Sequence, residues 1–86
     1  MTTAEMLALE LLAAGDPHTF RDGSLLVTVG GFAANAETLT VNSVQATFLG
    51  EPVVIDAPYV FINAPGGTLA DAHEMIAETV RHNGGL

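Results

Sequence analysis

The chain has 86 residues, of which 49% are hydrophobic and 14% are charged, with ten carboxylates, two strong bases and a net charge of −8. The hydrophobic content excludes a disordered acidic tail, and the shortage of positive charge argues against direct binding of nucleic acid. Because cysteine is absent, disulfides, thiolate zinc sites and cysteine nucleophiles are excluded as well.

The length fits a single domain over residues 1–86. A chain of this size hides only about 60–65% of its unfolded surface, so this one has more apolar side chains than its core can hold. We therefore expect a homo-oligomer. No apolar run approaches the ~20 residues of a membrane span. The first residues also lack the positive charge of a signal peptide, so we expect a cytoplasmic protein with no membrane contact.

The first predicted element is a helix over residues 4–14, which are rich in Leu, Met, Ala and Glu. Thr2 and Glu5 have the spacing of a capping box at its start. Gly15 supplies a C-cap, and Asp16-Pro17 stops the helix. The expected apolar face is formed by Met6, Leu9 and Ala13 and is broadened by Leu7, Leu11 and Leu12.

A hairpin is predicted next, because the Asp-Gly signal in Arg21–Ser24 favours pairing of His18–Phe20 with Leu25–Val29. Gly30-Gly31 is expected to end the second strand. Residues 32–35 are compatible with a loop or a short turn.

From Thr38 the hydrophobic pattern has a period of two, which predicts strands. Leu39 and Val41 share one parity, but the next apolar residues continue on even numbers. Since a strand cannot change parity without an irregularity, Asn42-Ser43 is predicted to be a β-bulge or a tight turn. The even-numbered residues are Val44, Ala46 and Phe48.

After a loop expected at 50–52, odd-numbered apolar residues from Val53 to Phe61 predict a further strand. Pro58 lacks an amide donor, which indicates an edge strand or a break. Residues 63–67 carry the strongest loop signal.

A second helix is predicted to begin at Thr68, which forms a capping-box pattern with Asp71. Arg81 and His82 suit its last turn, and glycines follow at 84 and 85. The expected apolar stripe contains Leu69, Ala72, Met75 or Ile76, and Val80. The sequence thus predicts an α+β fold, with helices at both ends covering one face of a mostly antiparallel sheet of three to five strands.

The most definite surface feature is a stripe of Asp71, Glu74, Glu78 and His82 along one side of the second helix. A solvated face explains it most simply. The functional hypothesis is a contact surface for a basic partner, carried by Asp71, Glu74 and Glu78. Exposed carboxylates with one imidazole make a poor metal site, so we expect no bound metal.

Gly66, Gly67 and Thr68 lead into a helix start, where an anion can bind. The spacing and the lysine of a P-loop are absent, however. Turn geometry is therefore the simpler interpretation, and binding of a small anion or nucleotide is the alternative.

No catalytic residue is expected. Ser24 and Ser43 fall in predicted turns without the surroundings of a nucleophile. His73 fits a half-buried packing residue, and His18 fits local turn chemistry beside Asp16. We expect neither an enzyme nor a cofactor.

The composition resembles that of small accessory proteins of phages that infect high-GC bacteria, with thirteen alanines and no lysine. The stretch from Tyr59 to Pro65, an aromatic and aliphatic strand before an Asn-x-Pro turn, is similar as well. This resemblance implies a short, non-catalytic protein that acts on a host or virion partner in the host cytoplasm.

Together these features predict a self-associating, acidic protein–protein interaction module, with a host-takeover or anti-defence factor as its sharper form. A basic host protein is the expected partner. The alternatives are a structural or assembly subunit of virion type, which the apolar excess favours, and a small-anion or nucleotide binder at Gly66-Gly67.

Overall fold

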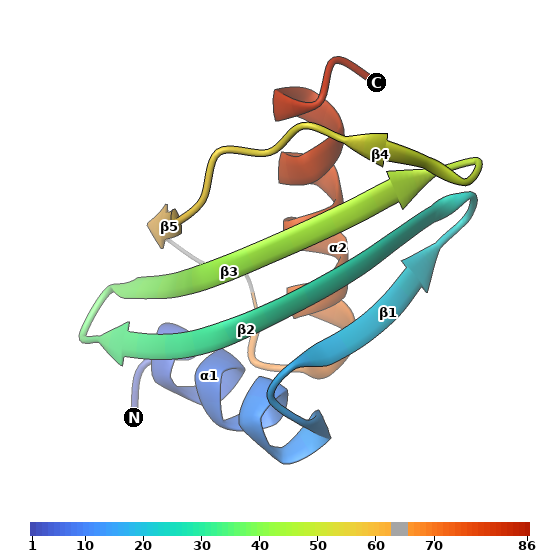
Figure 1. Ribbon diagram of the computed structural model, residues 1–86. Coiled ribbons are helices and arrows are strands. Elements are labelled where there is room, and N and C mark those ends of the chain that lie inside the picture. The colour runs from blue at the N-terminus through green and yellow to red at the C-terminus, as the bar shows by residue number, and fades with distance from the viewer. Residues whose placement is uncertain (63–65) are drawn as a thin grey trace.

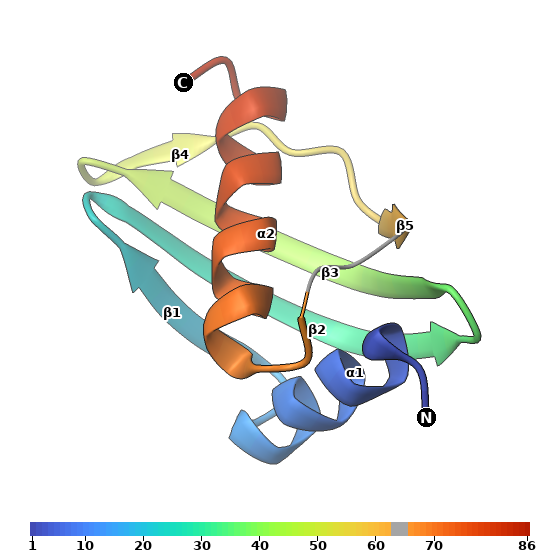
Figure 2. The same cartoon turned by 180° about the vertical axis from the view of Figure 1, so that it is seen from behind.

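The computed structural model describes residues 1–62 and 66–86. Its elements in chain order are α1 (Thr3–Ala14), β1 (His18–Asp22), β2 (Leu25–Asn35), β3 (Thr38–Phe48), β4 (Glu51–Val53), β5 (Tyr59–Ile62) and α2 (Leu69–Asn83). Both helices lie on the same face of the sheet, and the other face carries no helix (Figures 1 and 2). The predicted α+β architecture is confirmed.

The sheet is antiparallel throughout. The strands β1, β2, β3 and β4 are neighbours in that order. The strands β4 and β5 pair with the same edge of β3, β4 at its end and β5 at its beginning. The predicted hairpin is present, with His18 opposite Val29 and Asp22 opposite Leu25. Helices from the two ends of the chain therefore meet over strands that are consecutive in sequence.

Both predicted capping boxes are formed. The backbone N–H of Glu5 donates to Thr2 Oγ1, while Thr2 N–H donates to Glu5 Oε1 at 2.9 Å. The same exchange joins Thr68 and Asp71 at the start of α2. Gly15 is the C-cap of α1, as its position after the apolar run predicted.

The buried face of α1 differs from the expected one. Ala4, Leu7, Ala8 and Leu11 are buried, whereas Met6, Leu9 and Leu12 are 43%, 52% and 47% exposed. Leu7 and Leu11, which were expected to broaden the face, are buried. The centre of the face was predicted wrongly because α1 is apolar almost all round, so its pattern favours no single side. The two alanines in the buried stripe let the helix backbone approach the sheet closely.

The β2–β3 hairpin holds the main irregularity of the fold. Gly30-Gly31 does not end β2, which continues to Asn35, so residues 32–35 are strand and not loop. Val29 lies opposite Val44 and Phe32 opposite Val41 in one continuous register. A bulge or turn at Asn42-Ser43 was therefore a wrong prediction, because no residue is inserted in either strand. Instead, the alternation of inward and outward side chains shifts by one residue in both strands, at facing positions.

Side chains hold this double parity change in place. Gly31 has a φ of +68°, and its carbonyl accepts a hydrogen bond from Asn42 Nδ2 at 2.7 Å. Its N–H donates to Asp16 Oδ1 at 3.2 Å. Because only glycine adopts this conformation easily, Gly31 permits the kink, and Asn42 and Asp16 secure it.

Beyond β3 the chain follows a less regular edge. The segment expected as a loop at 50–52 instead turns at Gly50 and forms the short strand β4. Residues 54–58 are not strand, so Pro58 lies in a break, as one of its two predictions stated. Tyr59 and Phe61 then point to the helix side of the sheet. Asn63, Ala64 and Pro65 of the predicted loop lie outside the described residues.

One apolar core lies between the sheet and the two helices. No polar or charged residue is buried within the described ranges. The largest fully buried side chains are Leu7, Leu11, Leu25, Val27, Val29, Leu39, Val41, Ile76 and Val80.

The kink in β2 gives a stability prediction with a matched control. A Cβ at Gly31 would lie 2.9 Å from Asn42 Cβ, whereas Gly50, at φ +83°, has no atom within 4 Å of such a Cβ. Gly50→Ala should lower the free energy of unfolding by about 1–2 kcal/mol through backbone strain. Gly31→Ala should cost about 1–3 kcal/mol more through overpacking. Urea denaturation measures both, and equal losses would contradict the tight contact.

Candidate functional site

The acidic stripe predicted on the second helix lies on the outer side of α2. We call Asp71, Glu74 and Glu78 the acidic ridge. Glu74 and Glu78 are exposed, and the three carboxylate residues border a shallow hollow of about 210 Å³ together with Met75. The structure therefore brings the three predicted partner-binding residues together, while His82 lies exposed one turn beyond them.

Asp71 differs from the other two acids because it also caps α2. Its Oδ2 accepts hydrogen bonds from Thr68 Oγ1 at 2.7 Å and from Thr68 N–H at 3.3 Å. The same carboxylate lies against Gly66, in the segment for which anion binding was the alternative to simple turn geometry. An incoming anion at Gly66, Gly67 and Thr68 would have to displace it, which makes this helix start unfavourable for binding.

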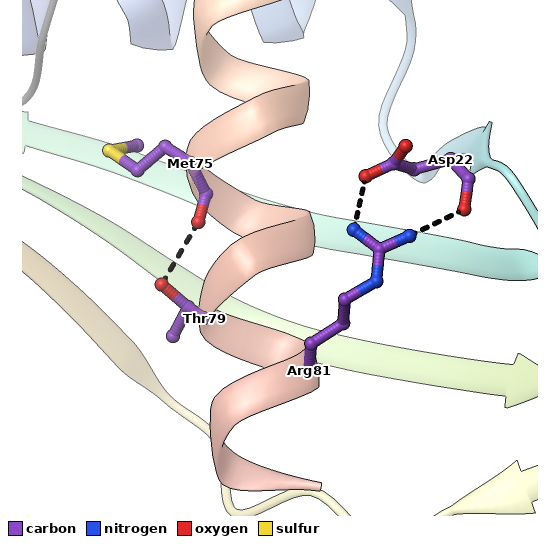
Figure 3. Close-up of polar contacts among 4 residues, drawn as sticks. All are labelled: Asp22, Met75, Thr79 and Arg81. Atoms are coloured by element: carbon purple, nitrogen blue, oxygen red, sulfur yellow. Dashed lines mark hydrogen bonds and ion pairs between the residues drawn. The ribbon is translucent and has the colours of Figure 1, made fainter. Parts of the chain in front are cut away.

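Arg81 ties the last turn of α2 to the end of β1 (Figure 3). One guanidinium nitrogen donates to Asp22 Oδ2 at 2.6 Å and the other to the Asp22 backbone carbonyl at 2.9 Å. On the opposite side of the helix, Thr79 Oγ1 donates to the Met75 carbonyl at 2.9 Å. The planar fork of arginine is suited to such a double contact, so Arg81 fixes α2 relative to β1.

A cleft of about 600 Å³ lies between β1 and α2. Both strong bases of the chain line it, along with three acids. The full lining is Arg21, Asp22, Ala70, His73, Glu74, Glu78 and Arg81. The inner flank of the acidic ridge is therefore of mixed charge, and its outer flank is the more acidic.

A pair of histidines, His18 and His73, forms a part-buried contact beside this cleft. His18 Nε2 and His73 Nε2 are 2.8 Å apart, although 55 positions separate the two residues. Their rings are within 15° of parallel, with centroids 5.0 Å apart. Most of that separation lies along the Nε2–Nε2 line, so the rings meet end to end. His73 also stacks on Phe20, with centroids 4.2 Å apart.

Burial lowers the pKa of His73, and the nearby charge of His18 lowers it further. Desolvation disfavours an imidazolium, and a second positive charge at this distance repels it. When neither ring carries an added proton, one ring donates its Nε2–H and the other accepts. His73 is thus the half-buried packing residue that the sequence predicted, but His18 takes part in more than local turn chemistry.

Two further groups have shifted pKa values. Hydrogen bonding to the backbone and then to the side chain of Thr2 lowers the pKa of Glu5. Burial raises the pKa of the Tyr59 hydroxyl, and the Asp56 carboxylate adds to this effect. The Tyr59 hydroxyl has no hydrogen-bond partner in the described part of the chain. Neither group lies in the β1–α2 cleft.

Comparisons with protein families, curated proteins and solved structures found no match to this chain. Among residues 1–62 and 66–86, no three His, Cys, Asp or Glu side chains gather closely enough to hold a metal ion. No described helix is both long and apolar enough to cross a membrane.

The face of the sheet turned away from the helices has an unusual composition. We call it the open face. Its paired strand positions include one charged residue, Arg21, and no carboxylate. Val60 and Ile62 are 56% and 66% exposed on it. Directly paired positions on this face are Thr19, Arg21, Leu26, Thr28, Gly30, Ala33, Asn35, Thr38, Thr40, Ser43, Gln45, Thr47, Pro52, Val60 and Ile62.

The Arg81 contact gives a second stability prediction. Arg81→Lys keeps the positive charge but cannot reproduce both hydrogen bonds to Asp22. Because Arg81 and Asp22 are 37% and 43% exposed, we expect a loss of only about 0.5–1 kcal/mol in the free energy of unfolding. Arg21→Lys, at the other, more exposed arginine, is the control and should change stability less. An equal effect in thermal denaturation would contradict the role of the fork.

Proposed function

We propose that this protein is a non-enzymatic interaction module that self-associates through the open face of its sheet. The observation that carries the proposal is the absence of carboxylates from that face in a chain with a net charge of −8. Antiparallel sheets with one solvated face normally carry polar and charged residues there. Depletion of charge is instead a property of the centre of protein interfaces.

The distribution of charge supports a second copy of the chain as the occupant. Two highly acidic chains repel each other least where neither presents a carboxylate. The open face also offers a shallow groove of about 390 Å³, bordered by Leu26, Gln45, Thr47 and Pro52. Packing of two such faces would place the helices outside and display an acidic ridge on each side.

Self-association is tested with a nearly isosteric change on the open face. Gln45→Glu would place carboxylates into the proposed interface and should weaken the dimer by about tenfold or more. Because each chain is acidic, dimerisation of the unaltered protein should strengthen as salt screens the repulsion. Sedimentation equilibrium measures both effects.

The control for this test is Ala36→Glu, which adds the same charge in the turn between β2 and β3. It should leave the dimer intact. A monomeric unaltered protein at high concentration and high salt, or equal weakening by the two substitutions, would refute self-association through the open face.

The second part of the proposal is that the acidic ridge binds a basic partner. Glu74 and Glu78 are exposed next to the apolar Met75 side chain, an arrangement that suits a lysine or arginine with its aliphatic stem. If the resemblance to phage accessory proteins holds, this partner is a host protein and the module a host-takeover or anti-defence factor.

Charge reversal tests the ridge. Glu74→Lys with Glu78→Lys should abolish capture of proteins that the unaltered chain retains from a lysate, because attraction becomes repulsion. Asp71 is left in place, since its cap stabilises α2. A control with Glu10→Lys and Glu51→Lys makes the same change in net charge elsewhere and should retain capture. Quantitative mass spectrometry measures the captured proteins. An equal loss of capture in both variants would show that net charge alone matters and would contradict a specific role of the ridge.

An assembly subunit is a second candidate, favoured by the exposed side of α1. Met6, Leu9 and Leu12 form an apolar stripe in the helical layer, away from the open face. Two separate contact surfaces, this stripe and the open face, allow growth beyond a closed dimer. Sedimentation separates the two candidates, because an interaction module stops at a small oligomer while an assembly subunit polymerises with concentration.

A further inference from the structure

We propose that His18 and His73 form a proton-controlled latch, which holds the first half of α2 on β1 while at most one proton is added to the pair and releases it when both rings are protonated. The latch lies inside the fold and does not depend on the identity of any partner. It is a property of one contact between two segments that are distant in the sequence.

The end-to-end geometry explains why the number of protons matters. With no added proton, one Nε2–H donates to the lone pair of the other Nε2 across 2.8 Å. With one added proton, the imidazolium donates to the neutral ring in a stronger, charge-assisted bond. With two, both nitrogens carry hydrogens that point at each other, and like charges face across the same distance. The contact must then open.

In the described structure no carboxylate is hydrogen-bonded to either ring, so the direct contact between the rings is the one that a second added proton breaks. On α2 the charged residues of the cleft are Glu74, Glu78 and Arg81, and on β1 they are Arg21 and Asp22. Asp22 is bound to Arg81. Asp16, before β1, accepts from Gly31. The titratable residues of α1 are Glu5 in its cap and the exposed Glu10; β2 and β3 have none.

Opening of the latch would be local. Arg81 holds the last turn of α2 on Asp22 at 2.6 Å, about two helical turns beyond His73. The first half of the helix can therefore loosen about that anchor. Because Glu74 follows His73, loosening would move the acidic ridge. Control of partner binding by pH would rest on the proposed function of the acidic ridge. The contact between the two histidines and its opening do not depend on that function.

The direction of the pH effect follows from linkage. The pKa of His73 is lowered in the folded chain, so its neutral form stabilises the fold. That stabilisation is complete above the unfolded value of about 6.5 and is lost as pH falls through the lowered folded value. Each extra proton bound by the open form raises its population by up to about tenfold per pH unit.

The test is an imidazole NMR titration of the unaltered, ¹⁵N-labelled protein from about pH 8 to about pH 4.5. His18 and His73 should show the same two inflections, because a proton added to one ring changes the contact that both share. Amide exchange, corrected for its intrinsic pH dependence, should show that residues 72–77 open more often by up to about tenfold per pH unit below 6.5. Amides near Arg81 should change less.

Two variants provide the matched comparison. His73→Phe keeps an aromatic ring to stack on Phe20 but removes the titrating group, so the pH-dependent opening should disappear. His82→Gln removes the third histidine and should leave the opening unchanged. Single, independent inflections for His18 and His73 in the unaltered protein would overturn the latch, whether or not the variants fold. Undiminished pH-dependent opening in a folded His73→Phe variant would overturn it as well.

Discussion

The simultaneous change of parity in β2 and β3 is the constraint on which the rest of the structure depends. Side chains of a flat strand alternate strictly, so the apolar residues at the two ends of this hairpin would otherwise face opposite sides. The kink at Gly31 and Asn42 turns Leu39 and Val41 to the same side as Val44 and Ala46. Only then can two helices cover one continuous apolar surface.

The same constraint determines what remains on the other side. Because most large apolar side chains of the strands are directed toward the helices, the open face keeps five threonines together with the scattered apolar residues Leu26, Val60 and Ile62. The ten carboxylates lie instead on the helices, in the turns and near the sheet margins. Charge and burial are thus sorted together, with the exposed carboxylates of Glu74 and Glu78 on the helical side and no carboxylate at the paired strand positions of the open face.

Local rules predicted most of the fold. Both capping boxes, the Asp-Gly hairpin and the parity change depend on residues close in sequence, and each is present. The face of α1 was misassigned because its apolar residues surround the helix, and the depth of packing selected the alanine stripe. Gly30-Gly31 was misread as a strand end because a glycine pair permits either a turn or a kink.

The candidate sites divide in the same way. The acidic ridge could be predicted because its members lie on successive turns of a single helix. The pairing of His18 with His73 could not, since it joins residues 55 positions apart and depends on how α2 crosses β1. No local signal in the sequence predicts that crossing. A sheet face without helices was predicted, but the absence of carboxylates from its paired positions emerged only from the full strand register.

The carboxylate of Asp16 has a consequence beyond the kink that it helps to secure. β1 covers β2 only as far as Val29, and farther along no other described strand lies on that side of β2. By accepting the Gly31 N–H, Asp16 places a negative charge at the first uncovered backbone position. Exposed strand margins invite uncontrolled pairing with other chains, and inward-pointing charges discourage it. One short side chain thereby occupies a backbone donor of this bare margin and discourages the pairing of a further strand there.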